Sequence, residues 1–244
     1  MADIQITNLV KRYGQITAVD IQNMQIRSGE LFTMLGVNGA GKSTLIKMLS
    51  CVAKPTSGDA TLDGYSICKD AAQVKHLIGV SPQETAVAPN LTVKENLELI
   101  CGIHGFSREK SYARIAQLSE GFGLAEVYSR KAGKLSGGWQ RRLSLAMALI
   151  GEPKILFLDE PTLGLDVLAR QDLWKLIRQL KGRVTIILTT HYMEEAQALS
   201  DRIGILQGGR LLAVGTPEEL MQKAQADNLE AAFVTIVGKG GKNL

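Results

Sequence analysis

Residues 36–43 place the strongest constraint on how this chain can fold. They read GVNGAGKS, which fits the spacing G-x-x-x-x-G-K-[ST], and they lie between an apolar run at Leu31–Leu35 and a helical pattern at 43–50. The glycines let the backbone curl so that successive N–H groups point at one anion, and the following helix presents its positive end to the same anion. Lys42 can bring charge to the β- and γ-phosphates of a nucleotide, and the Ser43 hydroxyl can ligate Mg²⁺. The segment predicts a phosphate-binding loop between a strand and a helix.

Strands that alternate with helices predict the fold class. Apolar runs at 155–158 and 184–189 are typical of buried strands, and a helical pattern over 168–180 separates them. This order favours an α/β fold with a parallel sheet. Short apolar and polar steps over 2–30 predict antiparallel strands, turn signals predict a hairpin at 55–64, and residues 76–80 predict a further strand. Helical spacing from about 92 to 150 indicates an inserted helical lobe.

Two acids, Asp159 and Glu160, follow the apolar strand at 155–158. Ligands bind beyond the carboxyl ends of parallel strands, so we expect both acids beside the phosphate loop. Adjacent side chains of a strand point to opposite sides, which suits two tasks. Asp159 would hold Mg²⁺ through its water shell, and Glu160 would polarise the attacking water. The alternative is that Glu160 only caps a helix before Pro161.

A second anion-binding segment appears at residues 135–140, which read LSGGWQ and open a helix predicted to end near Ile150. Ser136 is expected as the N-cap of that helix, and Gly137 and Gly138 leave its first N–H groups bare. One nucleotide does not need two phosphate sites from distant segments unless a second subunit contributes one of them. The sequence therefore predicts ATP bound between two copies.

With these motifs in this order, the sequence from Asn8 to Gly238 resembles the ATP-binding subunits of ABC (ATP-binding cassette) transporters. The resemblance implies a P-loop NTPase (RecA-like) parallel-sheet core with an N-terminal antiparallel β subdomain and an inserted α-helical subdomain. It implies one ATPase domain over 1–238, in which 1–85 and 151–220 form the core and β subdomain and about 86–150 form the helical one. Residues 221–244 would be a C-terminal cap and flexible tail, with fraying over 238–243.

The resemblance also implies roles for single residues. Tyr13 would stack on adenine, Gln83 would contact Mg²⁺ or water, and His191 would contact the γ-phosphate and orient the water of Glu160. Simpler roles stay open for all three: packing for Tyr13, a solvated loop residue for Gln83 and a structural residue for His191. The expected catalytic residues are Glu160, His191, Gln83 and Lys42, and the expected metal ligands are Ser43, Gln83 and Asp159. The expected nucleotide-binding residues are Tyr13, Gly36, Val37, Asn38, Gly39, Ala40, Gly41, Lys42, Ser43 and Thr44, and in trans Ser136, Gly137 and Gly138.

One position departs from the usual pattern of the family, because Trp139 stands where glutamine is common. Trp139 either packs against Leu143, one turn further on, or contacts the region of the ribose of the partner's nucleotide. The departure affects only this ribose contact, since Ser136 and Gly138 still form the phosphate site.

The resemblance implies ATP hydrolysis with Mg²⁺, a separate transmembrane permease subunit, and dimerisation on ATP binding with a second copy or a related ATPase subunit. The apolar runs are far shorter than the ~20 residues of a membrane helix, so we expect a cytoplasmic protein, peripheral on the inner face of the membrane through the permease. The net charge of +4 is spread along the chain, and no nucleic-acid partner is expected. Cys51, Cys68 and Cys101 lack CxxC spacing, which favours reduced thiols over a metal site.

Residues 161–166, 190–196 and 228–233 resemble the ABC-2-type export branch, which contains drug, lipid and polysaccharide exporters. For 228–233, an ordinary amphipathic cap is the alternative. Two other functions use the same site: the ATPase of an ABC importer, and a soluble ABC ATPase that acts on a nucleic-acid or ribosomal partner. A P-loop kinase would lack both the 135–140 motif and His191.

Overall fold

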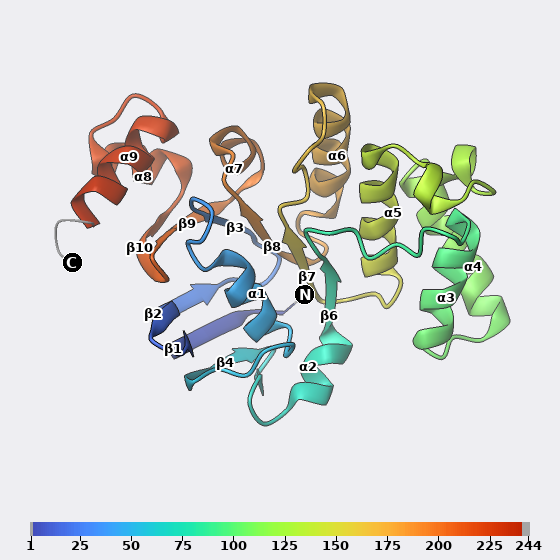
Figure 1. Ribbon diagram of the computed structural model, residues 1–244, viewed down its shortest axis with the longest axis horizontal. Helices are drawn as coiled ribbons and strands as arrows, with labels where there is room; N and C mark the ends of the chain where they lie inside the picture. Colours follow the sequence, from blue (N-terminus) through green and yellow to red (C-terminus); the bar gives the residue numbers. More distant parts are fainter. Residues whose placement is uncertain (1, 241–244) are drawn as a thin grey trace.

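The computed structural model describes residues 2–240 and arranges their strands in one ten-stranded sheet (Figure 1). The order across the sheet is β5-β4-β1-β2-β10-β9-β3-β8-β7-β6. The strands are β1 Ile4–Tyr13, β2 Ile16–Ile26, β3 Leu31–Leu35, β4 Ser57–Leu62, β5 Tyr65–Ser66, β6 Ile78–Ser81, β7 Ile155–Asp159, β8 Thr185–Thr190, β9 Arg202–Gln207 and β10 Arg210–Gly215.

The parallel part of the sheet consists of β9, β3, β8, β7 and β6. Every residue of β3, β7 and β8 is buried, as expected for strands covered on both faces. In the register, Leu35 pairs with Thr190 and Asp159 pairs with Thr189, so three carboxyl ends meet at one edge. The prediction of an α/β fold with a parallel core is confirmed.

The antiparallel part begins with β1 and β2, as predicted, and continues through β4 and β5. The hairpin is formed by β4 and β5 and lies at 57–66, not at 55–64. Residues 57–62 are in β4, which pairs with β1, and the chain turns at Asp63 and Gly64. Both turn residues have positive φ, 52° and 82°, which matches the Asp-Gly turn signal.

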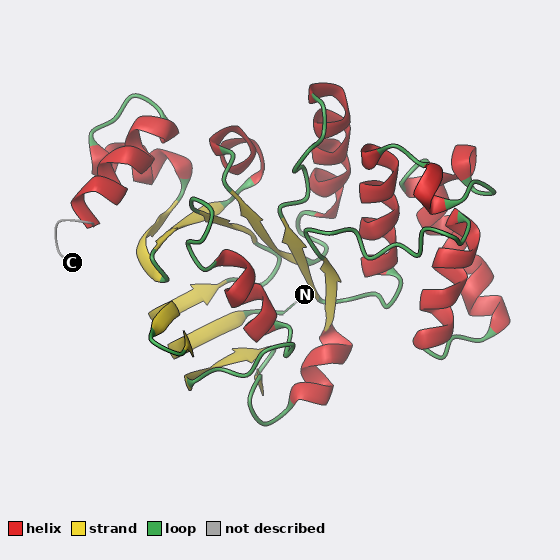
Figure 2. Cartoon of the chain, in the orientation of Figure 1, coloured by secondary structure: helices red, strands yellow, loops and turns green. Residues whose placement is uncertain are grey.

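The helices lie on both sides of the sheet and beyond its β6 edge (Figures 1 and 2). Helices α3 and α4 lie beyond β6, and α8 and α9 lie at the opposite end of the molecule, beside β10. The helices are α1 Lys42–Leu49, α2 Ala71–Leu77, α3 Val93–Ile103, α4 Arg108–Gly121, α5 Gly137–Leu149, α6 Val167–Leu180, α7 Met193–Leu199, α8 Pro217–Ala224 and α9 Leu229–Gly240, with short 3₁₀ turns at Leu124–Val127 and Ala132–Lys134.

The strand prediction at 76–80 is partly wrong, because His76 and Leu77 end helix α2 and the strand starts at Ile78. A short apolar run does not by itself distinguish a strand from the end of a helix. Parallel pairing with β7 decides where β6 begins.

Alternate residues of the central strands face two hydrophobic clusters. Leu31 and Leu156 join the cluster that contains the helical lobe, and Phe32 and Phe157 join the cluster under α1 and the antiparallel strands. The lobe is thus packed on the same parallel strands that carry the phosphate loop. Within residues 2–240, no helix is long and apolar enough to cross a membrane.

The C-terminal segment packs against β9 and β10. Leu229 and Phe233 of α9 are buried against Ile203, Ile205 and Ala213 of β9 and β10. Residues 238–240 are helical and belong to α9, whereas 241–243 lie outside the described residues, so the expected fraying stays a prediction. The division into subdomains at residues 85, 150 and 220 stays a prediction.

Candidate functional site

The phosphate loop connects β3 to α1 and leads directly into Lys42, the first residue of α1. Gly41 precedes it with a φ of 105°, in the left-handed region that favours glycine. The Lys42 side chain is only 6% exposed, and its Nζ donates to the carbonyl oxygens of Gly36 (2.7 Å) and Val37 (3.3 Å). Backbone carbonyl oxygens of the loop therefore hold the Lys42 ammonium group in place.

A cavity of about 320 Å³ opens over this loop. It is lined by residues from the loop and from four other segments: Ala18, Asn38, Gly39, Ala40, Gly41, Lys42, Ser43, Thr44, Gln83, Glu160, Leu163 and His191. Ten of these residues were predicted as site residues: Asn38 through Thr44, Gln83, Glu160 and His191. The fold brings the loop, the β6 loop and the ends of β7 and β8 to one cavity.

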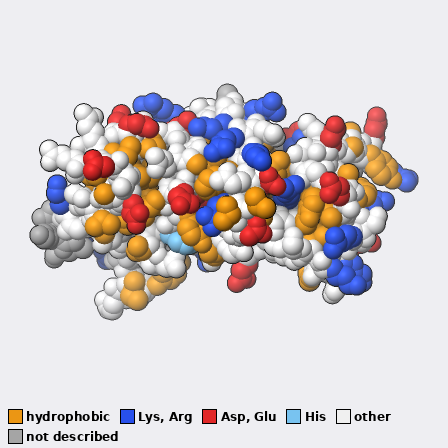
Figure 3. All heavy atoms as spheres, turned by 90° about the horizontal axis from the view of Figure 1, so that it is seen from above, with side chains coloured by type: hydrophobic (Ala, Val, Ile, Leu, Met, Phe, Trp, Pro, Cys, Tyr) orange, Lys and Arg blue, Asp and Glu red, His pale blue; other side chains and the backbone are white. Residues whose placement is uncertain are grey.

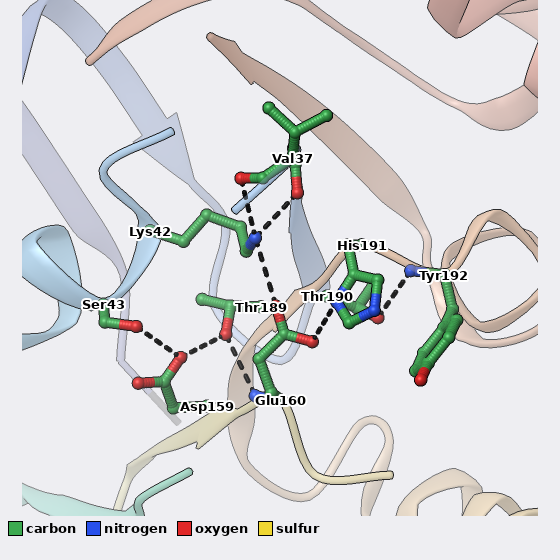
Figure 4. Close-up of polar contacts among 10 residues, drawn as sticks. Val37, Lys42, Ser43, Asp159, Glu160, Thr189, Thr190, His191 and Tyr192 are labelled. Atoms are coloured by element: carbon green, nitrogen blue, oxygen red, sulfur yellow. Dashed lines mark hydrogen bonds and ion pairs between the residues drawn. The ribbon is translucent and has the colours of Figure 1, made fainter. Parts of the chain in front are cut away.

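Glu160 and Asp159 point to different partners, as the strand geometry predicts (Figure 4). Asp159 Oδ1 accepts hydrogen bonds from Ser43 Oγ at 3.1 Å and Thr189 Oγ1 at 2.5 Å. Glu160 Oε1 lies 3.1 Å from Lys42 Nζ, and Glu160 Oε2 lies 2.8 Å from His191 Nδ1. Each acid is thus bound to a different part of the loop.

The backbone at Glu160 has a φ of 49°, which is uncommon for a residue with a side chain. Its N–H donates to both the carbonyl and the hydroxyl oxygen of Thr189, at 3.1 Å each, and so keeps this conformation at the end of β7. Strain of this kind gathers at functional sites. Here it turns the carboxylate toward Lys42.

His191 follows β8 and is fixed from two sides. Its Nδ1 faces the Glu160 carboxylate, which can only accept, so Nδ1 carries the proton and Nε2 is left to interact elsewhere. The ring lies 4.1 Å, centroid to centroid, from the ring of Tyr192, whose N–H donates to Thr190 Oγ1. The Arg170 guanidinium stacks on the Tyr192 ring, 4.9 Å from its centroid.

Some of the predicted site residues lie outside the cavity lining. Tyr13 is 51% exposed and has the Lys11 ammonium 5.0 Å from its ring centroid. Gly36 and Val37 contribute carbonyl oxygens to Lys42, and Asp159 acts through Ser43.

The residues Ser136, Gly137 and Gly138 are at the start of α5, also outside the cavity. Ser136 is the N-cap by position, but its hydroxyl makes no capping bond, contrary to the usual N-cap pattern. Ser136 and Gly137 are exposed. A serine hydroxyl and bare helix N–H groups therefore face outward from this copy.

Trp139 packs against the hydrophobic cluster that includes Leu143, with the Arg142 guanidinium 4.9 Å from its ring centroid. The packing interpretation of this position is thus confirmed within one copy. The ribose contact stays a prediction.

The start of α5 is also tied to the loop that carries Gln83. Arg141 is 8% exposed, and its Nη1 donates to the Pro82 carbonyl at 2.9 Å. Gln140 accepts a hydrogen bond from Thr85 at 3.4 Å and donates to the carbonyl oxygens of Ala132 and Leu135. The Gln83 loop and the N-terminal end of α5 are therefore joined by hydrogen bonds.

Several residues in and around the site are not marked by any motif in the sequence. Thr189, which binds both acids, is one β-branched residue in an apolar strand, and Ala18 and Leu163 line the cavity without polar groups. Glu195, four residues beyond His191, is fully buried and accepts from Trp174 Nε1 at 3.0 Å. A buried acid of this kind can be recognised only once the packing is known.

Comparison with known proteins decides the family. The model of the ABC transporter family matches residues 19–163, which is more than half of the chain. The chain belongs to the ABC transporter family. This cassette is 39% identical over 243 residues to the probable multidrug ABC transporter ATP-binding protein YbhF of Escherichia coli (strain K12), covering 96% of the chain and 41% of that protein. It is 40% identical to the daunorubicin resistance ATP-binding protein DrrA3 of Streptomyces coeruleorubidus, covering 96% of the chain and 75% of that protein.

Solved structures of ABC cassettes share the fold. An ATP-binding subunit of an ABC transporter superposes with a TM-score of 0.85 at 26% identity, covering 96% of this chain and 99% of that one. An ATP-binding cassette in a dimeric post-hydrolysis state, bound to ADP and Pi, gives 0.78 at 27% identity, covering 87% and 98%. The chain spans about two fifths of the length of YbhF, 41%, and three quarters of DrrA3, 75%.

Gly41→Ala should remove nucleotide binding from this ABC cassette. A Cβ at position 41 would lie 2.3 Å from the Ala18 carbonyl oxygen, in a backbone conformation that L residues rarely adopt. Gly39→Ala is the matched control, since Gly39 also has positive φ, 81°, but has no atom within 4 Å of an added Cβ. We expect at least about a tenfold larger loss of ATP affinity for Gly41→Ala, measured by calorimetric titration. Equal losses would show that the contact with Ala18 does not shape the loop.

The buried carboxyl of Glu195 should make stability depend on pH. Burial raises the pKa of Glu195 above its ordinary value of 4.5, because the charged form is poorly solvated there. The neutral carboxyl therefore contributes to stability fully below that ordinary value, and the contribution is lost as pH rises through the pKa of the folded chain.

Glu195→Gln keeps an oxygen for Trp174 and stays neutral at every pH. The free energy of unfolding of this variant should exceed that of the parent by an amount that grows between about pH 5 and about pH 8 in urea titrations. Glu194→Gln, at an exposed neighbour, is the control and should show no such trend. A constant difference across this range would argue against a protonated Glu195.

Proposed function

We propose that this chain is the ATP-hydrolysing subunit of an ABC exporter. The supporting observation is the position of Glu160, whose carboxylate lies between Lys42 (3.1 Å) and His191 (2.8 Å) at the mouth of the phosphate loop. A carboxylate held there can accept a proton from water that attacks a phosphate bound to the loop.

The loop would bind the phosphates of ATP. Residues 39–43, including Lys42, line the cavity together, and a Cβ at Gly41 would collide with the Ala18 carbonyl oxygen beside it. The amides of such a loop, with the positive end of α1, stabilise negative charge that develops on the transferred phosphoryl group. Tyr13, at the exposed end of β1, is the proposed adenine contact.

Ser43, Asp159 and Gln83 fit Mg²⁺. Ser43 Oγ and Asp159 Oδ1 are 3.1 Å apart, and Gln83 lines the same cavity. Mg²⁺ prefers oxygen donors and is usually bound by few protein groups together with substrate phosphates. Residues 2–240 contain no cluster of three or more His, Cys, Asp or Glu that could hold a metal alone, which agrees with this kind of site. When bound, Mg²⁺ would neutralise charge on the β- and γ-phosphates.

His191 would position the catalytic base. Because Nδ1 donates to Glu160, the imidazole fixes the rotamer of that carboxylate. The opposite nitrogen, Nε2, is then available to the γ-phosphate. His191 and Glu160 together would place the attacking water, while Lys42 stabilises the phosphoryl charge.

ATP would be shared between two copies. Ser136 and Gly137 are exposed and do not line their own copy's cavity, which supports a contact with the nucleotide of a partner. A related cassette at 27% identity forms a dimer with ADP and Pi bound, which supports the same arrangement here. The partner would be a second copy or a related ATPase subunit.

Export through a separate permease is supported by the relatives. YbhF is described as multidrug, DrrA3 as a daunorubicin resistance protein, and a Burkholderia orbicola relative at 41% identity as a Nod factor export protein. We propose that this chain acts from the cytoplasmic face of the membrane through a permease subunit. On the face shown in Figure 3, basic, acidic and hydrophobic side chains are interspersed, which does not favour a nucleic-acid partner.

Phosphate release from Mg-ATP tests this function. The purified chain should hydrolyse ATP, and the rate should rise when it is bound to a detergent-solubilised permease encoded beside it. Nucleic acid should leave the rate unchanged. Stimulation by RNA or DNA, together with no binding to such a permease, would instead support a soluble ABC ATPase. ATP-driven uptake of doxorubicin into inverted membrane vesicles would distinguish export from import.

A further inference from the structure

A second cavity lies between the β9–β10 turn and the helices α8 and α9. Its volume is about 460 Å³, within the range of sites for small molecules. In Figure 1 these elements are the orange and red part of the chain, beside β10. The lining residues are Gln207, Gly208, Arg210, Leu211, Leu212, Lys223, Ala224, Thr235, Ile236 and Lys239.

The charges of this cavity have one sign. Arg210, Lys223 and Lys239 come from three different elements, and no acid is among the lining residues. Within residues 2–240, none of the three cations makes an ion pair or a side-chain hydrogen bond. Asp20 is the register partner of Arg210, but its carboxylate accepts from Gln22 Nε2 at 3.1 Å. The three cations are therefore available to an anion.

Apart from the backbone of Gly208 and the polar side chains of Gln207 and Thr235, the rest of the lining is apolar. Leu211, Leu212 and Ile236 are half-buried, and Ala224 is buried. Gln207 Oε1 is buried without a hydrogen-bond partner among the described residues, which leaves one acceptor for a ligand's donor. Cations at the rim and an apolar wall suit a molecule with one anionic group and an apolar body.

The same turn contacts the phosphate loop. Gly209 N–H donates to the Ala40 carbonyl at 3.0 Å, and Gly209 O accepts from Asp20 N–H at 2.7 Å. A Cβ on Gly209 would lie 2.8 Å from the Ala18 carbonyl oxygen. Ala18 and Ala40 line the nucleotide cavity, whereas Gln207 and Gly208 line the second one. One four-residue turn, 207–210, thus separates the two cavities.

We propose that the cavity between the β9–β10 turn and α8–α9 is a binding site for a small organic anion with an apolar body, and that its occupancy changes nucleotide affinity through the contact of Gly209 with Ala40. This site goes beyond the proposed ATPase function. The ligand class is a carboxylate, sulfonate or phosphate ester attached to a hydrocarbon or aromatic group.

Fluorescence of 8-anilinonaphthalene-1-sulfonate tests the site on the purified chain. Lys223→Glu/Lys239→Glu should weaken binding of this probe by at least about tenfold, because two lysine cations that attract the sulfonate are replaced by carboxylates that repel it. Lys69→Glu/Lys75→Glu, at two exposed lysines on the opposite part of the chain, should leave it within about twofold. Decanoate should displace the probe, whereas decan-1-ol and inorganic phosphate should not. Equal binding by both variants, or displacement by phosphate alone, would overturn the proposed site.

Titration of a fluorescent ATP analogue with and without decanoate tests the coupling. Decanoate should change its affinity by about threefold or more in the parent chain and leave it unchanged in Lys223→Glu/Lys239→Glu. The same shift in both proteins, or none in the parent, would overturn the coupling. Without decanoate, the variant should bind nucleotide and release phosphate like the parent, so a failure here is distinguishable from a failure of the ATPase function.

Discussion

Glu160→Gln should reduce ATP hydrolysis by about 10²–10⁴-fold while ATP binding is retained, because the amide cannot accept the proton of the attacking water. The glutamine has nearly the same shape, so its oxygen can still face Lys42 and its side chain can still contact His191. Phosphate release under saturating Mg-ATP measures the turnover. The variant should also accumulate as an ATP-bound dimer on gel filtration.

Glu194→Gln is the matched control, because it makes the same chemical change at an exposed acid that pairs with Arg170 at 3.6 Å. It should hydrolyse ATP at a rate close to that of the parent. A normal rate for Glu160→Gln would show that Glu160 is not the base, and the contact of Glu160 with Lys42 would then be structural.

Ser136→Arg should abolish dimer closure and lower hydrolysis at least about tenfold, with nucleotide binding by the single copy unchanged. Ser136 is exposed and does not line its own copy's cavity, so we expect a larger side chain there to leave that cavity open to nucleotide. In a shared site, the added bulk would separate the two copies. Sedimentation velocity with ATP, in the Glu160→Gln background, measures the dimer.

Ser129→Arg adds the same group to an exposed position of the same lobe and should leave dimerisation intact. If Ser136→Arg weakened nucleotide binding and dimerisation equally, the start of α5 would not be a site that acts in trans. If it affected neither, Ser136 would be remote from the nucleotide.

The sequence was most informative where chemistry demands fixed spacing. A phosphate loop needs glycine and lysine at consecutive positions, as at Gly41 and Lys42. The acids Asp159 and Glu160 directly follow a buried strand. Both features are contiguous in sequence, so local patterns predict them. The parallel register then brings Asp159 level with Thr189, a contact that no local pattern contains. Thr189 looks like any β-branched strand residue until its hydroxyl is seen between the two acids.

Elements with weak local signals were missed or misplaced. β9 and β10 alternate little and form through pairing with each other and with β3, while α2 has seven residues and buries only Val74. The sequence predicts a C-terminal cap and tail over 221–244 but not the bounds of α9 at 229–240, because burial of Leu229 and Phe233 depends on strands far away in sequence. In these cases long-range packing decides the structure.

A cross-link between the phosphate loop of one copy and α5 of another tests the central claim most directly. Asn38, exposed and lining the cavity, and Ser136 would be changed to cysteine in a Glu160→Gln chain with Cys51, Cys68 and Cys101 replaced. With a short bismaleimide, the shared site predicts a covalent dimer with ATP and little with ADP. Val52→Cys in place of Asn38→Cys, at an exposed position after α1, should give none. A dimer of equal yield with ADP, or its absence with ATP, would contradict an ATP site built from two copies.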